Sequence, residues 1–196
     1  MDPRPSDVDL LRRIGEGDLA SVGALYDRYA ATLLPLALRI LRDRTDAEDV
    51  VHDAFVAVAD RAGQYTPDRG SVIAWLVTLV RNLSIDRTRR RDRRGAIDRE
   101  IVTNEPSPPA PGPEALTADA QERAKITRAL RSLPDIQRRT LEIAFYEGLS
   151  YPEIAAREGV PLGTIKSRAA RALMALREAL AKEGVVPEEL ARPPHV

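Results

Sequence analysis

The sequence predicts an all-α protein made of two small helical domains joined by a proline-rich linker. Apolar residues recur at intervals of three and four along most of the chain, which is the period of a helix, and no stretch shows the alternation of a strand. Five prolines lie within residues 104–113, and no helix or central strand tolerates that number. We therefore expect a first domain at 1–95, an acidic proline-rich linker at 96–117, a second domain at 118–182 and a tail at 183–196.

The first domain is expected to begin with two helices. Ser6 is placed to cap a short helix over 7–15, and Asp18 precedes a longer helix with an apolar stripe. Pro35 lies inside the longer helix, where it removes a backbone donor and clashes with the preceding turn, so we expect a kink there or two helices. The stripe begins with Leu19, Val22, Leu25, Tyr26 and Tyr29.

Two further helices complete the first domain. Thr45 and Glu48 have the spacing of a capping box and predict a helix at about 46–62. A loop over 63–70 follows, and Ser71 is placed to cap a helix that continues into an arginine-rich run. The residues expected to face the core from these two helices are Val51, Phe55, Val58, Val72, Leu76, Leu79, Val80 and Leu83.

The second domain is expected to hold four helices. The first two run over about 117–131 and 134–148. Ser150 and Glu153 form a capping-box pattern for the third, and the fourth runs over about 162–182.

The composition excludes several classes of protein. Because the chain has no cysteine, it has no disulfide, no cysteine-ligated zinc and no thiol nucleophile. The two histidines, His52 and His195, cannot form a histidine-rich metal site, and we expect neither a metal nor a cofactor. A phosphate-binding glycine loop and a nucleophile constellation are also missing, so we expect no enzyme. The chain lacks an apolar run near the roughly 20 residues of a membrane span and lacks a signal core, which predicts a cytoplasmic protein without membrane insertion.

Charge is strongly segregated along a chain whose formal net charge is zero. Residues 81–99 hold eight arginines against three aspartates, whereas residues 43–60 hold six acids against one arginine. Residues 100–122 hold five acids and no base, and residues 162–182 hold five bases against one glutamate. Such blocks indicate separate surfaces for separate partners, at least one of them polyanionic. The alternative is that each block is an ordinary solvated face.

The most informative motif spans residues 150–176. A short helix, the turn Gly159-Val160-Pro161 and a longer helix form the layout of a helix-turn-helix, whose second helix enters the DNA major groove. Its basic and hydroxyl side chains suit contacts to phosphates and base edges. These candidate DNA-binding residues are Thr164, Lys166, Ser167, Arg168 and Arg171. The alternative is a structural corner of a helix bundle.

At this point the sequence resembles a known family. Residues 130–180 (LRSLPDIQRRTLEIAFYEGLSYPEIAAREGVPLGTIKSRAARALMALREAL) are similar to region 4 of bacterial sigma factors of the extracytoplasmic-function (ECF) group. The segment from about residue 20 to residue 91 is similar to region 2 of the same group. The resemblance implies an RNA polymerase sigma factor that directs core polymerase to promoters and helps to open the DNA, as a monomer in the holoenzyme. It also implies an anti-sigma factor as a partner.

The resemblance implies that the helix at 46–62 docks on the clamp helices of the largest polymerase subunit. Asp46, Asp49 and Asp53 form one acidic stripe on that helix, and His52 stands where the family commonly has glutamine. We assign these four residues to polymerase binding. The alternatives are a solvated face, or a metal site formed by Asp49, His52 and Asp53.

The resemblance also implies that residues 64–94 melt and read the minus-ten element, and that the helix-turn-helix reads the minus-thirty-five element. In the family the loop matching 65–71 holds a flipped base, for which Tyr65 offers a stacking surface and Arg69 edge donors. Trp75 is either a core residue or a stacking platform. The residues assigned to the minus-ten DNA are Tyr65, Arg69, Ser71, Arg81, Asn82, Arg87, Arg89, Arg90 and Arg91.

Two rival functions differ from that of a sigma factor. A stand-alone helix-turn-helix repressor would bind DNA by itself as a symmetric dimer, and the acidic stripe and unlike halves oppose it. The arginine run by itself also suits RNA or an acidic protein. The second rival is an enzyme such as a metal-dependent hydrolase, and the sequence lacks the paired histidines, cysteines and nucleophile constellation that such an enzyme needs.

Overall fold

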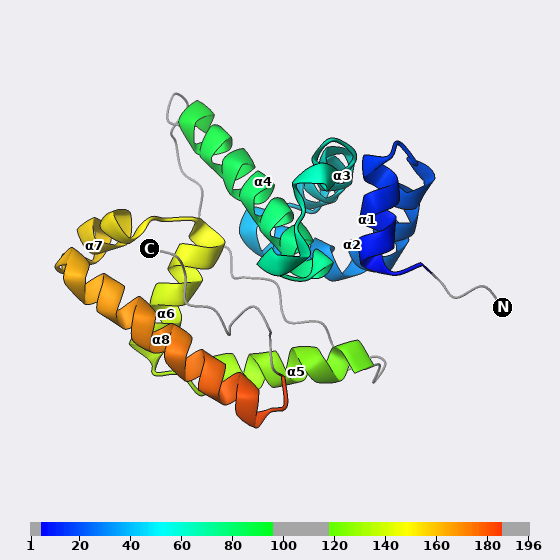
Figure 1. The fold of residues 1–196 in the computed structure, drawn as a ribbon. Helices are drawn as coiled ribbons and strands as arrows, with labels where there is room; N and C mark the ends of the chain where they lie inside the picture. Colours follow the sequence, from blue (N-terminus) through cyan, green and yellow to red (C-terminus); the bar gives the residue numbers. More distant parts are fainter. Residues whose placement is uncertain (1–4, 96–117, 186–196) are drawn as a thin grey trace. The chain divides into compact units, whose positions relative to one another are not determined.

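The computed structural model describes residues 5–95 and 118–185, and all regular elements in these ranges are helices (Figure 1). The chain divides into two compact units, with the division near residue 108. An all-α fold of two helical units is therefore confirmed. The expected linker at 96–117 and most of the expected tail lie outside the described residues.

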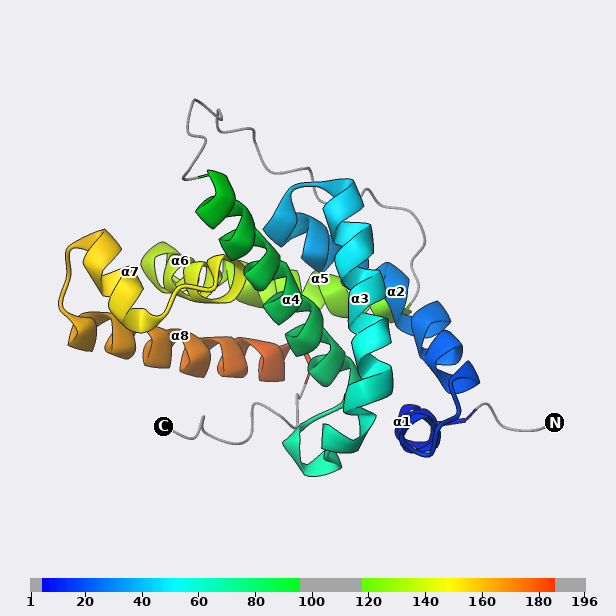
Figure 2. The same ribbon diagram turned by 90° about the horizontal axis from the view of Figure 1, so that it is seen from above.

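The first unit is a bundle in which three long helices pack on one another. They are α2 (Ala20–Leu41), α3 (Arg44–Arg61) and α4 (Val72–Gly95), and α1 (Asp7–Gly15) lies against α2 and α3 (Figure 2). Two 3₁₀ turns, η1 (Ala62–Gln64) and η2 (Pro67–Arg69), connect α3 to α4. The largest fully buried side chains of this core are Leu10, Leu25, Leu33, Leu41, Leu76, Val50, Val58 and Val80.

Both serine caps predicted for this unit are present. Ser6 caps α1 by accepting from the Asp9 amide, and Ser71 accepts from the Ala74 amide at 3.3 Å, as predicted. The capping box of Thr45 and Glu48 is wrong.

The helix α3 begins earlier, at Arg44. Asp43 is its cap and accepts a hydrogen bond from the Asp46 amide at 2.8 Å. The preceding residue, Arg42, has a left-handed φ of 57°, so the chain leaves α2 and starts α3 within two residues. Glu48 instead pairs with Arg44 at 2.8 Å.

Pro35 does not divide the long second helix. α2 runs from Ala20 to Leu41 as one helix, so the alternative of two helices is wrong. Pro35 is exposed. The carbonyl that loses its helical donor therefore lies on the solvent side of α2, where water can hydrogen-bond to it.

The second unit is built around its last helix. α8 (Leu162–Lys182) contacts α5 (Ala118–Arg131), α6 (Asp135–Glu142) and α7 (Tyr151–Glu158). The end of α6 continues as a π-helical turn, η3 (Ile143–Glu147), which the sequence pattern did not predict. The predicted capping box of Ser150 and Glu153 is present at the start of α7. Gly148 and Gly159 end their helices with φ of 67° and 66°, a conformation that glycine adopts without a steric cost.

Candidate functional site

The outer face of α3 carries the acidic side chains predicted to bind polymerase. Ala47, Val50, Ala54 and Val58 are buried on its inner face, and Asp49, His52 and Asp53 are exposed on its outer face. Among the described residues no group of three histidine, cysteine or carboxylate side chains is placed to hold a metal ion. The metal-site alternative for Asp49, His52 and Asp53 therefore has no support in the structure.

Asp46 differs from the rest of the stripe because it is bonded to α4. Arg87 donates from Nε and Nη2 to Asp46 Oδ1, at 2.9 and 2.6 Å, and from Nη2 to Asp49 Oδ2 at 2.9 Å. Arg91 Nη1 lies 3.9 Å from Asp46 Oδ2. The hydrogen bonds to Asp46 raise the pKa of the Arg87 guanidinium above its ordinary value. The structure thus joins two residues assigned to polymerase with two assigned to DNA.

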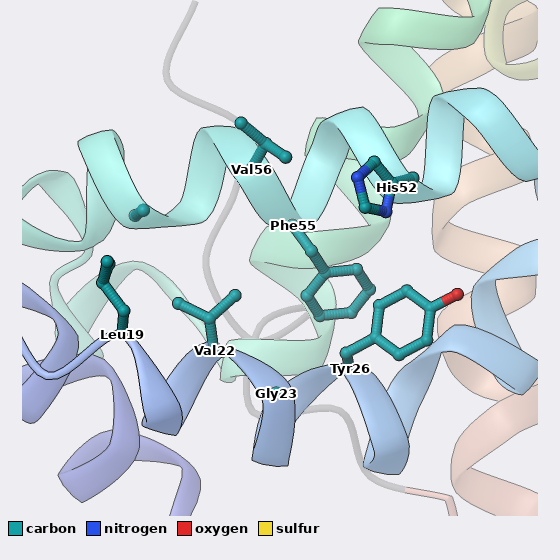
Figure 3. Close-up of a pocket in the computed structure, with 8 residues that line it drawn as sticks. Leu19, Val22, Gly23, Tyr26, His52, Phe55 and Val56 are labelled. Carbon is teal, nitrogen blue, oxygen red and sulfur yellow. The ribbon is translucent and has the colours of Figure 1, made fainter.

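An open apolar groove of about 450 Å³ lies between α2 and α3 (Figure 3). The rings of Tyr26 and Phe55 meet edge to face in it, with centroids 5.1 Å apart. Leu19 and Val56 are 67% and 56% exposed at its edges. The groove is lined by Leu19, Val22, Gly23, Tyr26, His52, Phe55, Val56 and Ala59.

The loop between α3 and α4 is held by an aromatic pair. The Tyr65 hydroxyl donates to the Gly70 carbonyl at 2.9 Å, and the Tyr65 ring meets Trp75 edge to face at 5.9 Å between centroids. Both rings are half-buried and pack on the bundle core. Trp75 therefore supports the loop from the core side, and Ser71 caps the helix that follows. The side chain of Arg69 lies outside the described residues.

The second half of α4 is a basic helix with little packing beneath it. Past Ile85, no described side chain of α4 is buried. Arg89, Arg90 and Arg91 are exposed there. Arg81 lies nearer the bundle and donates to Asn82 Oδ1 at 3.0 Å, and burial lowers the pKa of its guanidinium.

Helices α7 and α8 form the predicted helix-turn-helix. Ile154, Ala155 and Ile165 are buried where the two helices meet. Arg171 folds back on the preceding turn, with Nε donating to the Ser167 carbonyl at 3.2 Å and Nη2 to Ser167 Oγ at 3.3 Å. Thr164 is half-buried in the first turn of α8. One exposed face of α8 includes Gly163, Lys166, Ser167, Ala170, Arg171 and Met174.

Arg168 does not lie on that exposed face. Its Nη1 donates to Glu158 Oε2 at 2.8 Å, and the two side chains are only 17% and 21% exposed. Arg168, a candidate DNA-binding residue together with Ser167, therefore turns toward α7 and away from the exposed face. Lys166, another of the candidate DNA-binding residues, lies on the exposed face.

Within residues 5–95 and 118–185, no helix is both long enough and apolar enough to cross a membrane.

Comparison with known proteins identifies both units. Residues 25–94 match the family model of sigma-70 region 2, and residues 123–176 match that of sigma-70 region 4. The chain is 32% identical over 176 residues to an ECF RNA polymerase sigma factor, SigK, of Mycobacterium sp. (strain KMS), a match that covers 89% of this chain and 91% of that protein. The SigK protein of Mycobacterium tuberculosis (strain ATCC 25618 / H37Rv) is also 32% identical, with 89% and 94% covered.

One solved structure among the matches is Rhodobacter sphaeroides SigE in complex with the anti-sigma ChrR, with 32% identity, 88% of this chain and 99% of that chain covered, and a TM-score of 0.42. The two region models occur in family order, and the matched SigK proteins are aligned over nearly their whole length. The chain therefore belongs to the ECF group of sigma-70 RNA polymerase sigma factors.

Proposed function

We propose that this sigma factor divides its work among three surfaces. The outer face of α3 binds core polymerase, the 65–71 loop with α4 binds the minus-ten DNA, and the exposed face of α8 binds the minus-thirty-five DNA. The observation that carries this division is the separation of charge: carboxylates gather on α3, and arginines and lysine gather on α4 and α8.

The α3 surface suits a basic helical partner. Asp49 and Asp53 lie one turn apart on the exposed face, where they attract cations and repel DNA phosphates. His52 lies on the same face and also lines the apolar groove. This combination of charge and apolar area is typical of a protein interface and fits the clamp helices that the family resemblance implies.

The DNA surfaces suit strand opening and sequence reading. Positive charge along α4 past Ile85 follows a phosphate backbone, and the loop held by Tyr65 and Trp75 offers a fixed edge for an unstacked base. On α8, Lys166, Ser167 and Arg171 face outward from the first turns of a helix-turn-helix. The polymerase performs the chemistry, and this chain selects where it begins, as a monomer in the holoenzyme in the cytoplasm.

The test is transcription in vitro with purified core polymerase and a panel of candidate promoters. We expect transcripts from a subset of promoters only when the chain is added. The variant with both Asp49 and Asp53 changed to Arg should strongly reduce initiation. Asp27→Arg, at an exposed position of α2, is the control for a charge reversal away from α3. Equal transcription from every template, or none from any, would contradict the proposal.

A second proposed partner is an anti-sigma factor, which the family resemblance implies. Leu19 and Val56 expose apolar area at the groove between α2 and α3, and apolar area of that kind is typical of a surface that a protein covers. A native pull-down of the tagged chain from uninduced cells should recover a protein besides polymerase. Recovery of polymerase subunits alone would contradict this partner.

A further inference from the structure

Arg87 stands between the surface proposed for polymerase and the surface proposed for DNA. It lies on α4, where its neighbours Arg89, Arg90 and Arg91 are exposed. Its own guanidinium is bonded to α3, with Nε and Nη2 both directed at Asp46 and Nη2 also at Asp49. Arg87 therefore already has anionic partners of the kind that a DNA phosphate would supply.

The two carboxylates that hold Arg87 differ in accessibility. The Asp46 side chain is 26% exposed and receives two of the three short hydrogen bonds. The Asp49 side chain is 54% exposed and receives one. A basic group from a partner protein therefore reaches Asp49 more easily than Asp46, and it competes there with Arg87 Nη2 for the carboxylate. Such a contact would weaken the hold of α3 on Arg87.

We propose that Arg87 is an internal competitor, which in the free chain occupies the carboxylates that polymerase uses and is released toward DNA when polymerase binds Asp49. This inference rests on the proposed function of α3 and α4. It predicts that Arg87 opposes polymerase binding, whereas an arginine that only contacts DNA has no effect on that step. It also predicts that the carboxylates of α3 oppose DNA binding by the free chain.

The first test measures the affinity of the full-length chain for core polymerase in the absence of DNA. Arg87→Gln should tighten binding by about two- to five-fold, which is the range expected for one partly exposed ion pair. Arg90→Gln is the matched control, because it removes the same charge from the same helix and Arg90 forms no ion pair within residues 5–95 and 118–185. Equal effects of the two variants, or weaker binding by Arg87→Gln, would overturn the inference.

A double-mutant cycle separates competition from a change in the helix. If Arg87 acts through Asp49, then Arg87→Gln should tighten polymerase binding in the wild-type background and should have little effect in the Asp49→Asn background. An undiminished effect in that background would overturn the inference. Arg87→Lys keeps the positive charge but loses the paired guanidinium hydrogen bonds to Asp46. Its affinity for polymerase should therefore lie between those of the wild type and Arg87→Gln.

The second test measures binding of the free full-length chain to a single-stranded DNA oligonucleotide. Asp46→Asn should tighten this binding and steepen its salt dependence by up to about 0.7 units, the increment for one more phosphate contact on a single strand. Asp53→Asn is the matched control, since Asp53 lies on the same helix and forms no ion pair with a described residue. Equal effects of Asp46→Asn and Asp53→Asn would overturn the inference.

The control also tells the two proposals apart. Asp53→Asn should weaken core polymerase binding, because Asp53 faces outward and is not held by Arg87. If Asp53→Asn leaves that affinity unchanged, the proposed polymerase surface fails, whereas the single-stranded DNA test still decides the role of Arg87.

Discussion

Three basic residues of α8 have different surroundings although they lie within two turns. Arg168 is bonded to Glu158 and largely covered, Arg171 bonds Ser167 on the exposed face, and Lys166 is exposed. A guanidinium can bind two acceptors on a base edge at once, whereas an ammonium acts as a point charge that suits a phosphate. The three residues should therefore respond differently to truncation.

Arg171→Ala should change which minus-thirty-five sequences are transcribed. Loss of a base-reading arginine costs about 1–3 kcal/mol and relaxes specificity at one position, whereas loss of a phosphate-binding lysine weakens all sequences alike and lowers the salt slope by about one unit. Lys166→Ala should therefore reduce transcription from every promoter by a similar factor. The measurement is in vitro transcription across a library of single-base minus-thirty-five variants at two salt concentrations.

The assignments of Lys166 and Arg171 would be reversed if Lys166→Ala reordered the promoters and Arg171→Ala scaled them equally. If neither variant had an effect, α8 would be a bundle corner, and the DNA-binding role of the second unit would fail.

Arg168→Ala should destabilise the second unit without reordering promoters. The Arg168–Glu158 pair joins α8 to α7 and is mostly covered, so we expect a loss of about 1 kcal/mol in the free energy of unfolding. The double variant with Glu158→Ala should cost little more than Arg168→Ala, because the interaction is already lost. Chemical denaturation followed by circular dichroism measures both, with Arg177→Ala, exposed on the same helix, as the control. A reordered promoter preference in Arg168→Ala would show that Arg168 reads DNA.

At the scale of single elements, α3 has a packed face and an exposed acidic face. Changing Asp49 and Asp53 to Arg places two cations where a basic partner is expected, and we expect core polymerase affinity to fall about ten-fold or more. Helical content should stay the same, because both side chains are exposed and the buried face is untouched. A fluorescence titration measures the affinity and circular dichroism the helical content. Unchanged affinity would remove α3 from the polymerase interface.

Capping residues in the sequence predicted most of the helix starts that they were used for. They could not predict contacts between residues far apart in the chain. Ser6, Ser71 and Ser150 cap their helices as expected because a cap depends on residues within one turn. The predicted start of α3 was wrong because Asp43 and Thr45 are both residue types that cap helices. The left-handed turn at Arg42 places Asp43 at the cap position.

The pairing of Arg87 with Asp46 was not predicted, since it joins residues 41 apart in sequence. Its only sequence signal was the presence of opposite charge blocks on successive helices. Leu19 belongs to the predicted apolar stripe and is nevertheless exposed, because helical periodicity shows which side chains share a face and does not show whether another element covers that face.

At the scale of the whole molecule, acidic and basic blocks offset each other in the free chain, whose formal net charge is zero. We therefore expect the isolated chain to bind promoter DNA weakly, with a dissociation constant of roughly 10⁻⁴–10⁻⁶ M at physiological salt, which is the range of non-specific binding. Specific binding should appear only with core polymerase. Fluorescence anisotropy with labelled promoter DNA measures both states. Tight, sequence-specific binding by the free chain would favour the repressor alternative.

The absence of buried side chains on α4 past Ile85 in the described residues also has a consequence for local unfolding. A helix of about ten residues is marginal in water by itself, and here the packed turns from Val72 to Ile85 supply the nucleus on which the exposed turns extend. Arg89 and Arg93 are four residues apart, so their repulsion opposes that extension until anions screen it. Amide hydrogen exchange should therefore become faster along α4 toward its C-terminal end, and bound DNA should slow the exchange of those amides more than that of any amide in the bundle core.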